Sequence, residues 1–499
     1  MVTHHLAAGP QVVPGLRAVA ESFAGAGYRP DEIAALLGVA RDIPTTRADL
    51  SLYRRRLAAA PGPLADLVGL FAFGWPVAID RVMAALGSAG VDALVASGGL
   101  VERDGAAHAL VRIAPHDDVW IASDRPVEDE SDDDPQHVPG INPPATLLAA
   151  LTVRHPVGSA LDLGTGNGIQ ALLLARHCDR VVATDNNPRA LAFAAFNAAF
   201  NDVTTIELRA GSWFEPVAGE RFDLIVSNPP YVISPEHEYT YRDSGQEPGA
   251  VCATVIGGLP AHLTDRGYAS VLASWPVYVD RHWSEQPRQW MTPGGRAWVL
   301  QFSLDDPLSH AARWNQPLAS AGQLEAFDSS VGRWLDYTGS RGIEAIGYGA
   351  VILQQHDGAP TVVRADHVRA GHGDITAQVE RVFAAYDLVA GLDDTAFAGS
   401  TWQPAPELLV RRGLRHVGAD WQPAETVATL ADGALVEATL DPMMGEILLR
   451  STSGRSVRAA AEEVASLAGL EPDQLPGLLA AAVAMVRDLV TLGALVRAE

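Results

Sequence analysis

Apolar and polar residues alternate in different ways along the chain. From residue 12 to about 97, apolar residues recur every three or four positions, as in 31–37 and 76–86, and this spacing predicts amphipathic helices. Two short apolar runs follow, at 100–103 and 110–113, on either side of the turn-forming pair Asp104-Gly105. Strand-forming residues around an Asp-Gly pair predict a β-hairpin. The N-terminal region is therefore expected to be helical and to end in a small hairpin.

The middle of the chain, from about 141 to 355, alternates short apolar runs with helical segments. This alternation predicts an α/β fold with a doubly wound, Rossmann-like sheet. The candidate strands are 160–163, 180–183, 205–209, 224–226, 268–273, 297–301 and 345–354.

Two regions flank this sheet. Residues 128–134 are almost all acidic, have the composition of an exposed linker, and lack the glycine and distal glutamate of a calcium loop. We expect an N-terminal domain at 1–124, an acidic linker at 125–140, a sheet domain at 141–355 and a C-terminal α+β domain at 356–499.

The helices and hairpin of the N-terminal region resemble a winged-helix domain. Near the end of the chain, residues 489–496 repeat the pattern of residues 94–101, with a glycine before a Leu-Val pair. Either two helix-to-strand turns have converged on one sequence, or the C-terminal domain is a second, truncated winged helix.

Composition narrows the classes of function. The net charge is −24, and the 36 Lys or Arg residues are all arginine, which excludes lysine chemistry such as a Schiff base. A chain this acidic repels nucleic-acid phosphates unless its arginines gather on one face, so the charge weakly favours a protein or small-molecule substrate. We find no membrane-length apolar run and no signal-like N-terminus, and we expect a cytoplasmic protein with reduced cysteines.

A glycine-rich turn follows the first predicted strand of the sheet. It reads Asp162-Leu163-Gly164-Thr165-Gly166-Asn167-Gly168 and leads into a helix. Its glycines permit a tight turn and a close approach of the backbone to a ligand. The next strand ends in Asp185, whose carboxylate can accept hydrogen bonds from both ribose hydroxyls of a nucleoside. These residues predict a nucleoside-cofactor site, and by themselves they suit a Rossmann dehydrogenase equally well.

A second motif separates a dehydrogenase from other nucleoside-binding enzymes. The fourth predicted strand ends in Asn228-Pro229-Pro230-Tyr231, which a dehydrogenase does not need. Together the two motifs resemble class I S-adenosylmethionine-dependent N-methyltransferases of the Asn-Pro-Pro-Tyr type. That group includes release-factor glutamine methyltransferases and small-domain rRNA guanine-N2 methyltransferases. The resemblance covers roughly residues 138–305.

The resemblance implies S-adenosylmethionine as the cofactor and assigns residues to it. The cofactor would lie along the turn from Gly164 through Thr165, Gly166 and Asn167 to Gly168, with Asp162 at its methionine end, Asp185 at the ribose and Asn186 beside the adenosine. Release-factor enzymes carry an aspartate after the third strand that contacts the adenine amino group, and this chain has Ser212 and Trp213 there instead. Ser212 can still form a hydrogen bond, and Trp213 can cover the adenine.

The resemblance also implies the catalytic residues. The side-chain oxygen of Asn228 and the carbonyl of Pro229 would accept the two N–H bonds of a planar nitrogen and direct its lone pair at the methyl group. Pro230 would stiffen the loop, and Tyr231 would offer a flat face to a base or an amide. The reaction requires no metal, and no His/Cys cluster has the spacing of a metal site.

Upstream, residues 138–146 resemble the segment that closes over the methionine half of the cofactor, with Thr146 at the start of a helix. A plain proline-rich linker is the other interpretation of this segment.

The motifs leave the substrate open. The acidic charge and the Trp213-Phe214-Glu215-Pro216 segment favour a glutamine amide of a protein such as a translation factor. Winged-helix-like flanks favour an exocyclic amine of a base in rRNA or DNA, although Arg54-Arg55-Arg56 is the main basic cluster of the N-terminal region. A small-molecule amine is a further alternative, and so is a non-catalytic scaffold, which the intact Asn228 and Asp185 argue against.

Overall fold

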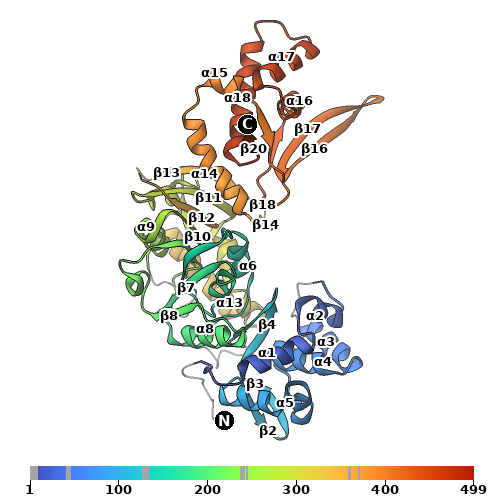
Figure 1. Ribbon diagram of the computed structural model, residues 1–499, viewed down its shortest axis with the longest axis vertical. Helices are drawn as coiled ribbons and strands as arrows, with labels where there is room; N and C mark the ends of the chain where they lie inside the picture. The colour runs from blue at the N-terminus through green and yellow to red at the C-terminus, as the bar shows by residue number, and fades with distance from the viewer. Residues whose placement is uncertain are drawn as a thin grey trace. The chain divides into compact units, whose positions relative to one another are not determined.

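The computed structural model confirms an α/β protein (Figure 1). It describes residues 9–40, 47–125, 134–236, 242, 246–357, 361–368 and 371–498, so most of the acidic run at 128–134 lies outside the described residues. The chain divides into two compact units, Met1–Ala149 with Pro156–Val251 and Ala150–His155 with Cys252–Glu499.

Four parallel strands form the sheet of the first unit. Their order is β9-β6-β7-β8. The strands are β6 (Val157–Leu163), β7 (Cys178–Asp185), β8 (Ile206–Ala210) and β9 (Phe222–Ser227). The connecting helices are α7 (Ile169–Leu174) and α8 (Pro188–Phe200), and α6 (Pro143–Ala150) precedes the sheet. Each of the four predicted strands is present. β6, β7 and β9 each contain a run of at least four consecutive buried residues, as expected for parallel strands covered on both faces, whereas β8 at the edge of the sheet alternates apolar and charged residues and is partly exposed.

The N-terminal region is helical, as its periodicity predicts. Its helices are α1 (Leu16–Gly25), α2 (Pro30–Leu37), α3 (Arg47–Ala59), α4 (Pro63–Leu67), the π-helical turn η1 (Val68–Ala72) and α5 (Ile79–Ala96). Its strands are β1 (Val77–Ala78), β2 (Leu100–Arg103), β3 (Ala106–Ala109), β4 (Arg112–His116) and β5 (Val119–Ser123).

The second strand of the hairpin begins earlier in the chain than the apolar runs suggest. Asp104 and Gly105 both have positive φ (51° and 73°), so they make a two-residue turn and β3 returns along β2 at once, from Ala106. The run at 110–113 was expected to be the partner of β2. Instead β3 pairs with β2, and only the second half of that run, Arg112 and Ile113, belongs to β4, which pairs with β5.

The N-terminal helices share a hydrophobic core with α8, the helix between β7 and β8. Phe23 of α1 packs edge-on against Phe200 of α8, with ring centroids 5.6 Å apart. The buried side chain of Asn197 on α8 exchanges two hydrogen bonds of 2.8 Å with the backbone of Ala122 on β5. Packing is therefore continuous between the N-terminal helices and α8.

The second unit contains longer strands. β12 lies antiparallel to both β10 and β11, and β13 pairs in parallel with β11, in the order β13-β11-β12-β10. The bounds are β10 (Leu263–Tyr278), β11 (Gly295–Asp305), β12 (Ile343–Gln355) and β13 (Thr361–His367). The three predicted strands are all present, and β13 continues the pairing beyond residue 355.

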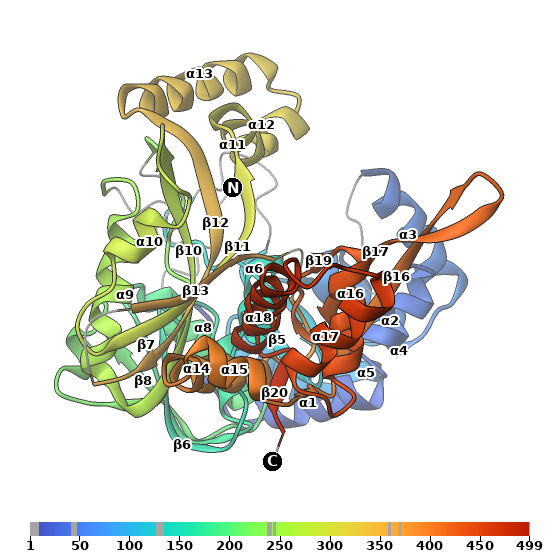
Figure 2. The same cartoon turned by 90° about the horizontal axis from the view of Figure 1, so that it is seen from above.

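Helices connect these strands. They are α9 (Ala250–His262), α10 (Glu285–Gln289), α11 (Pro307–Trp314), α12 (Gln316–Ser320) and α13 (Leu324–Ser340). Figure 2 shows α11, α12 and α13 grouped at the ends of β11 and β12. Tyr348 of β12 ties this group to the strand, because its hydroxyl is 2.7 Å from the indole nitrogen of Trp314 on α11, which donates to it.

The C-terminal region is a mixture of helices and short strands. Its helices are α14 (Thr376–Ala390), α15 (Asp394–Gly399), α16 (Pro442–Ser451), α17 (Val457–Ala468) and α18 (Leu475–Thr491). Its strands are β14 (Gly371–His372), β15 (Trp402–Pro404), β16 (Leu408–Val417), β17 (Asp420–Leu430), β18 (Gly433–Ala434), β19 (Ala438–Leu440) and β20 (Leu495–Arg497). None of the helices among the described residues is long and apolar enough to cross a bilayer.

The repeated sequence pattern corresponds to the same turn in both places. Gly98 and Gly493 have positive φ (79° and 76°) at the ends of α5 and α18. The amide of Gly99 donates to the carbonyl of Leu94, and the amide of Ala494 donates to that of Leu489, both at 2.9 Å. Each helix thus ends in a glycine-closed cap followed by a strand.

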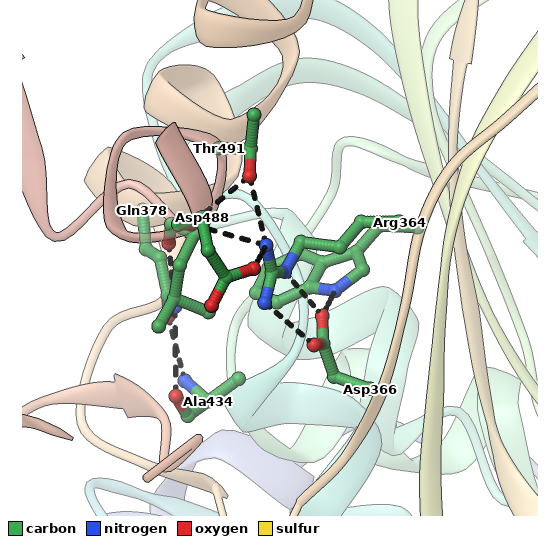
Figure 3. A network of polar contacts seen from close by, with 8 residues as sticks. Arg364, Asp366, Gln378, Ala434, Asp488 and Thr491 are labelled. Atoms are coloured by element: carbon green, nitrogen blue, oxygen red, sulfur yellow. Dashed lines mark hydrogen bonds and ion pairs between the residues drawn. The ribbon is translucent and has the colours of Figure 1, made fainter. Parts of the chain in front are cut away.

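A buried polar network anchors α18 to β13 (Figure 3). Asp366 accepts hydrogen bonds from the Arg364 guanidinium and from the Trp298 indole, at 2.7–2.8 Å. Arg364 also donates at 2.8 Å to Asp488 and to Thr491 of α18. Asp366 is buried, whereas Asp488 is half exposed. Loss of the Arg364–Asp366 pair, here called the inner pair, therefore leaves a buried charge without its partner.

We expect Asp366→Ala to lower the free energy of unfolding by about 3 kcal/mol, because Arg364 and Trp298 both lose an acceptor in a buried place. Denaturant unfolding of the whole chain, followed by tryptophan fluorescence, measures this change. Asp488→Ala is the matched control and should lower it by less than about 1 kcal/mol, because that carboxylate is exposed to solvent. Equal effects of the two substitutions would show that the inner pair has no special weight.

Candidate active site

The two sequence motifs lie at neighbouring strand ends. Leu163 of β6 is in register with Thr184 of β7 and with Ser227 of β9, so the loops that follow all three strands leave from the same edge of the sheet. The Ser227 hydroxyl donates to the Leu163 carbonyl at 2.8 Å and fastens the end of β9 to β6. The glycine-rich turn and Asn228 are therefore brought together, as expected for a ligand site at the carboxyl ends of parallel strands.

Asp162 holds the glycine-rich turn in shape. Its side chain is almost completely buried, and its Oδ2 accepts hydrogen bonds from the Thr165 hydroxyl at 2.6 Å and from the Ala171 amide at 3.0 Å. One oxygen thus connects the strand, the turn and the following helix. Burial raises the pKa of Asp162 to about 7, because the charged form loses its hydration.

The three glycines of the turn have different surroundings. Gly164 and Gly166 have positive φ (76° and 56°), and a Cβ placed on either would meet no atom within 4 Å. Gly168 also has positive φ, but a Cβ there would lie 3.0 Å from the Ala194 Cα of α8. The first two glycines therefore leave open backbone beside the turn, and the third permits close packing on a helix. This division of roles fits a nucleoside cofactor lying along the turn.

Asp185 closes the neighbouring loop. Its Oδ2 accepts from the Gly166 amide at 2.9 Å and its Oδ1 from the Asn187 amide at 2.8 Å. The Asn186 backbone amide also hydrogen-bonds this carboxylate, and the three amides do not use all of its lone pairs, so it can still accept from a ligand hydroxyl. Burial raises the pKa of Asp185, and its hydrogen bonds with the backbone amides oppose that rise. The exposed Asn186 follows directly.

The loop after β8 lies next to Asp185. The Gly211 backbone amide donates to the Asp185 carbonyl at 3.1 Å, so Ser212 and Trp213 follow a residue that is bonded to the end of β7. Gly211 is required here, since its φ is 149° and a Cβ would come within 2.5 Å of Pro216. Ser212 and Trp213 are both partly exposed, and Trp213 has a positive φ of 49°. Their contact with an adenine remains a prediction.

The segment upstream of the sheet contacts this site. The Asn167 side-chain Nδ2 donates to the Pro139 carbonyl at 2.9 Å, and the Asn187 side-chain Nδ2 donates to the Gln136 carbonyl at 3.0 Å. The sequence did not single out Asn187, although an asparagine before a proline at a helix start is a recognisable N-cap. Thr146 lies in the first turn of α6, and it is Asn142 whose side chain accepts from the Ala145 amide.

The Asn-Pro-Pro-Tyr loop presents polar and flat groups at the edge. Pro229 is buried, whereas Asn228, Pro230 and Tyr231 are partly exposed. A buried proline between partly exposed neighbours fixes the loop while leaving the Asn228 amide accessible. Within the described part of the chain, no three His, Cys, Asp or Glu side chains are grouped so as to hold a metal ion.

Comparison with known proteins gives the class of the central region. Residues 142–243 match the family described as the methyltransferase small domain, and residues 25–112 match a domain of unknown function. The chain is 39% identical over 128 residues to the release factor glutamine methyltransferase of Xylella fastidiosa. The matched region covers 23% of this chain and 46% of that protein. The enzyme of the same name from Aliivibrio fischeri is 41% identical over 136 residues, covering 26% and 48%.

The similarity is confined to one region. The chain spans about half the length of the curated relatives that it matches. Among solved structures, ribosomal protein L11 methylase from Lactobacillus delbrueckii subsp. bulgaricus is 26% identical to this chain, with a TM-score of 0.21. The match covers 26% of this chain and 57% of that one. The predicted resemblance to class I S-adenosylmethionine-dependent N-methyltransferases is confirmed for the central region, and S-adenosylmethionine is the methyl donor to which that resemblance points.

Asp185→Asn should weaken S-adenosylmethionine binding by about 1.5–3 kcal/mol, because it removes charge-assisted hydrogen bonds to the ribose while one oxygen can still accept from the backbone. Isothermal titration calorimetry measures the change. Asp179→Asn, at the exposed opposite end of β7, is the matched control and should leave the affinity unchanged. Unchanged affinity in Asp185→Asn would remove Asp185 from the cofactor site.

The raised pKa of Asp162 predicts a pH dependence of stability. The folded protein binds this proton up to about pH 7, whereas the unfolded chain releases it near the ordinary value of 3.8. Stability from this group is therefore lost as the pH rises between these values. Asp162→Asn keeps an oxygen that can accept from Thr165 and Ala171 but has no proton to lose. We therefore expect its free energy of unfolding, relative to that of the parent, to be about 1–3 kcal/mol higher at pH 8 than at pH 5. Parallel urea unfolding curves at both pH values test this, and a constant difference would contradict it.

Proposed function

We propose that the chain transfers a methyl group from S-adenosylmethionine to a planar nitrogen held by Asn228. The observation that supports this most directly is the register of β6 with β7 and β9, which places the glycine-rich turn, Asp185 and Asn228 at one sheet edge. The relatives with which this region shares 39–41% identity are methyltransferases by name.

In this proposal the chain's own residues perform binding and alignment. The open backbone at Gly164 and Gly166 and the remaining lone pairs of Asp185 hold the cofactor, which supplies an electrophilic methyl group. The Asn228 side-chain oxygen and the Pro229 carbonyl accept the two N–H bonds of the target and orient its lone pair along the line of displacement. Tyr231 covers the plane of the substrate group. A delocalised nitrogen is a poor nucleophile, so this alignment is the main contribution of the loop.

For the substrate we propose the side-chain amide of a glutamine in a cytoplasmic protein, with a translation release factor as the first candidate. The names of the relatives and the net charge of −24 support this choice. The alternative is an exocyclic amine of a base in rRNA or DNA, which presents the same planar NH₂ to Asn228. An unpaired arginine cluster in the N-terminal region, described below, is the observation that favours it.

A transfer assay separates the two substrates. The chain is incubated with tritium-labelled S-adenosylmethionine and, separately, with purified bacterial release factors or with unmethylated ribosomal RNA. Labelled protein, with the added methyl group located on a glutamine by mass spectrometry, supports the proposal. Label found only in RNA selects the alternative, and a lack of transfer to every fraction of a cell lysate would contradict methyl transfer itself.

Asn228→Ala should reduce turnover by about 100-fold or more, the scale expected when an alignment contact is lost, while S-adenosylmethionine affinity remains close to that of the parent. Single-turnover rates and calorimetry measure the two quantities. Tyr231→Ala should raise KM more than it lowers kcat, because a stacking face is used equally in ground and transition states. Normal turnover in Asn228→Ala would mean that the methylated atom is not a planar nitrogen held by this loop.

A further inference from the structure

A column of flat groups lies in the N-terminal region and includes none of the residues assigned to methyl transfer. The rings of Tyr53 and Phe73 are stacked 5.5 Å apart, with 22° between their planes. Phe73 stacks in turn on Trp75 at 4.7 Å and 25°. The guanidinium carbon of Arg54 lies 4.7 Å from the Trp75 ring centroid. The column therefore begins with the buried Tyr53 and ends with the exposed Arg54.

The same surface carries charge that the protein does not neutralise. Arg54, Arg55 and Arg56 are consecutive on α3, and the first two are exposed. Within the described part of the chain, none of the three forms an ion pair, and Nη1 of Arg56 is buried without a hydrogen-bond partner. Elsewhere in the same unit, Arg180 and Arg209 each contact two carboxylates. Three adjacent unpaired cations contrast with the net charge of −24.

The combination of flat groups and unpaired cations is specific in its chemistry. An acidic peptide would use the arginines but not the stacked rings. Duplex nucleic acid would use the phosphate charge, but its bases are already stacked on each other. A single-stranded segment uses both, because its phosphates meet the arginines and an unstacked base can extend the column at Arg54. Arginine suits that position, since its planar guanidinium stacks on rings and keeps its charge.

We propose that the surface formed by Arg54, Arg55, Arg56, Phe73 and Trp75 binds a single-stranded segment of RNA. Phosphates contact Arg55 and Arg56, and a base stacks on Arg54, which Trp75 supports from below. RNA is the source to which we commit, because its loops and bulges are where unstacked bases are offered for recognition. The inference does not rest on the proposed methyl transfer and holds for a protein or an RNA substrate.

Fluorescence anisotropy of a fluorescein-labelled, unstructured RNA of about 12 nucleotides, titrated with the full chain, tests this proposal. The double variant Arg54→Gln/Arg55→Gln should weaken binding by about 10-fold or more at low salt. It should also reduce the slope of log K against log salt by about 0.7, the value for the one single-strand phosphate contact that Arg55 makes. The matched control is Arg103→Gln/Arg458→Gln, which removes equal charge from two other exposed arginines and should change neither quantity.

A charge-preserving variant separates stacking from charge. Arg54→Lys retains the cation but loses the plane, so the affinity should fall by about 5-fold or more while the salt slope stays constant. The substituted side chains are exposed, and circular dichroism confirms that each variant is folded.

Four outcomes would overturn the proposal. They are no binding by the parent at about 50 mM salt, an equal loss in the control double variant, equal or tighter binding of the matching DNA strand, and displacement of the RNA by polyglutamate at the same charge concentration. The last would assign the surface to an acidic protein. Methyl transfer to a release factor, measured with the same variants, should be unchanged, so a failure here is distinguishable from a failure of the proposed function.

Discussion

The buried carboxylate of Asp162 is the constraint on which the candidate cofactor site depends. A glycine-rich turn has little preference for any one shape, because glycine populates both signs of φ. The hydrogen bonds from Thr165 and Ala171 to one Asp162 oxygen select the shape in which Gly164 and Gly166 leave their backbone open. This fastening places a carboxylate where its charge is poorly hydrated, which is why its pKa rises to about 7.

Most of the sheet and the shared edge of the two motifs could be predicted from sequence, for a simple reason. Buried parallel strands are apolar along their whole length, and the residue after each strand must lie at the carboxyl edge. The positions of Gly164, Asp185 and Asn228 follow from these two facts alone. The hairpin at Asp104-Gly105 could also be predicted from sequence, but the pairing of its strands could not. The start of β3 at Ala106 follows from the positive φ of both turn residues, which is known only from the structure.

Contacts between segments far apart in the chain could not be predicted in this way. Nothing in the proline-rich stretch shows that the Pro139 carbonyl meets Asn167. The column of flat groups at Arg54 could not be predicted for the same reason. Tertiary packing brings α3 next to Phe73 and Trp75, and the periodicity of the sequence does not indicate that contact. β13 was missed because a short strand after the last expected one has no distinct pattern, and only its pairing with β11 defines it.

The N-terminal region is also connected by hydrogen bonds to the glycine-rich turn. The Asn197 side chain on α8 is fully buried and donates one hydrogen bond to Ala122 of β5 and another to the Asn167 carbonyl in the glycine-rich turn, each of 2.8 Å. A single amide therefore connects the N-terminal strands with the loop that shapes the cofactor site. A buried amide that loses one partner leaves a polar group unsatisfied. Any displacement of β5 must consequently be felt at Asn167, which links the folding of the N-terminal region to the geometry of the turn.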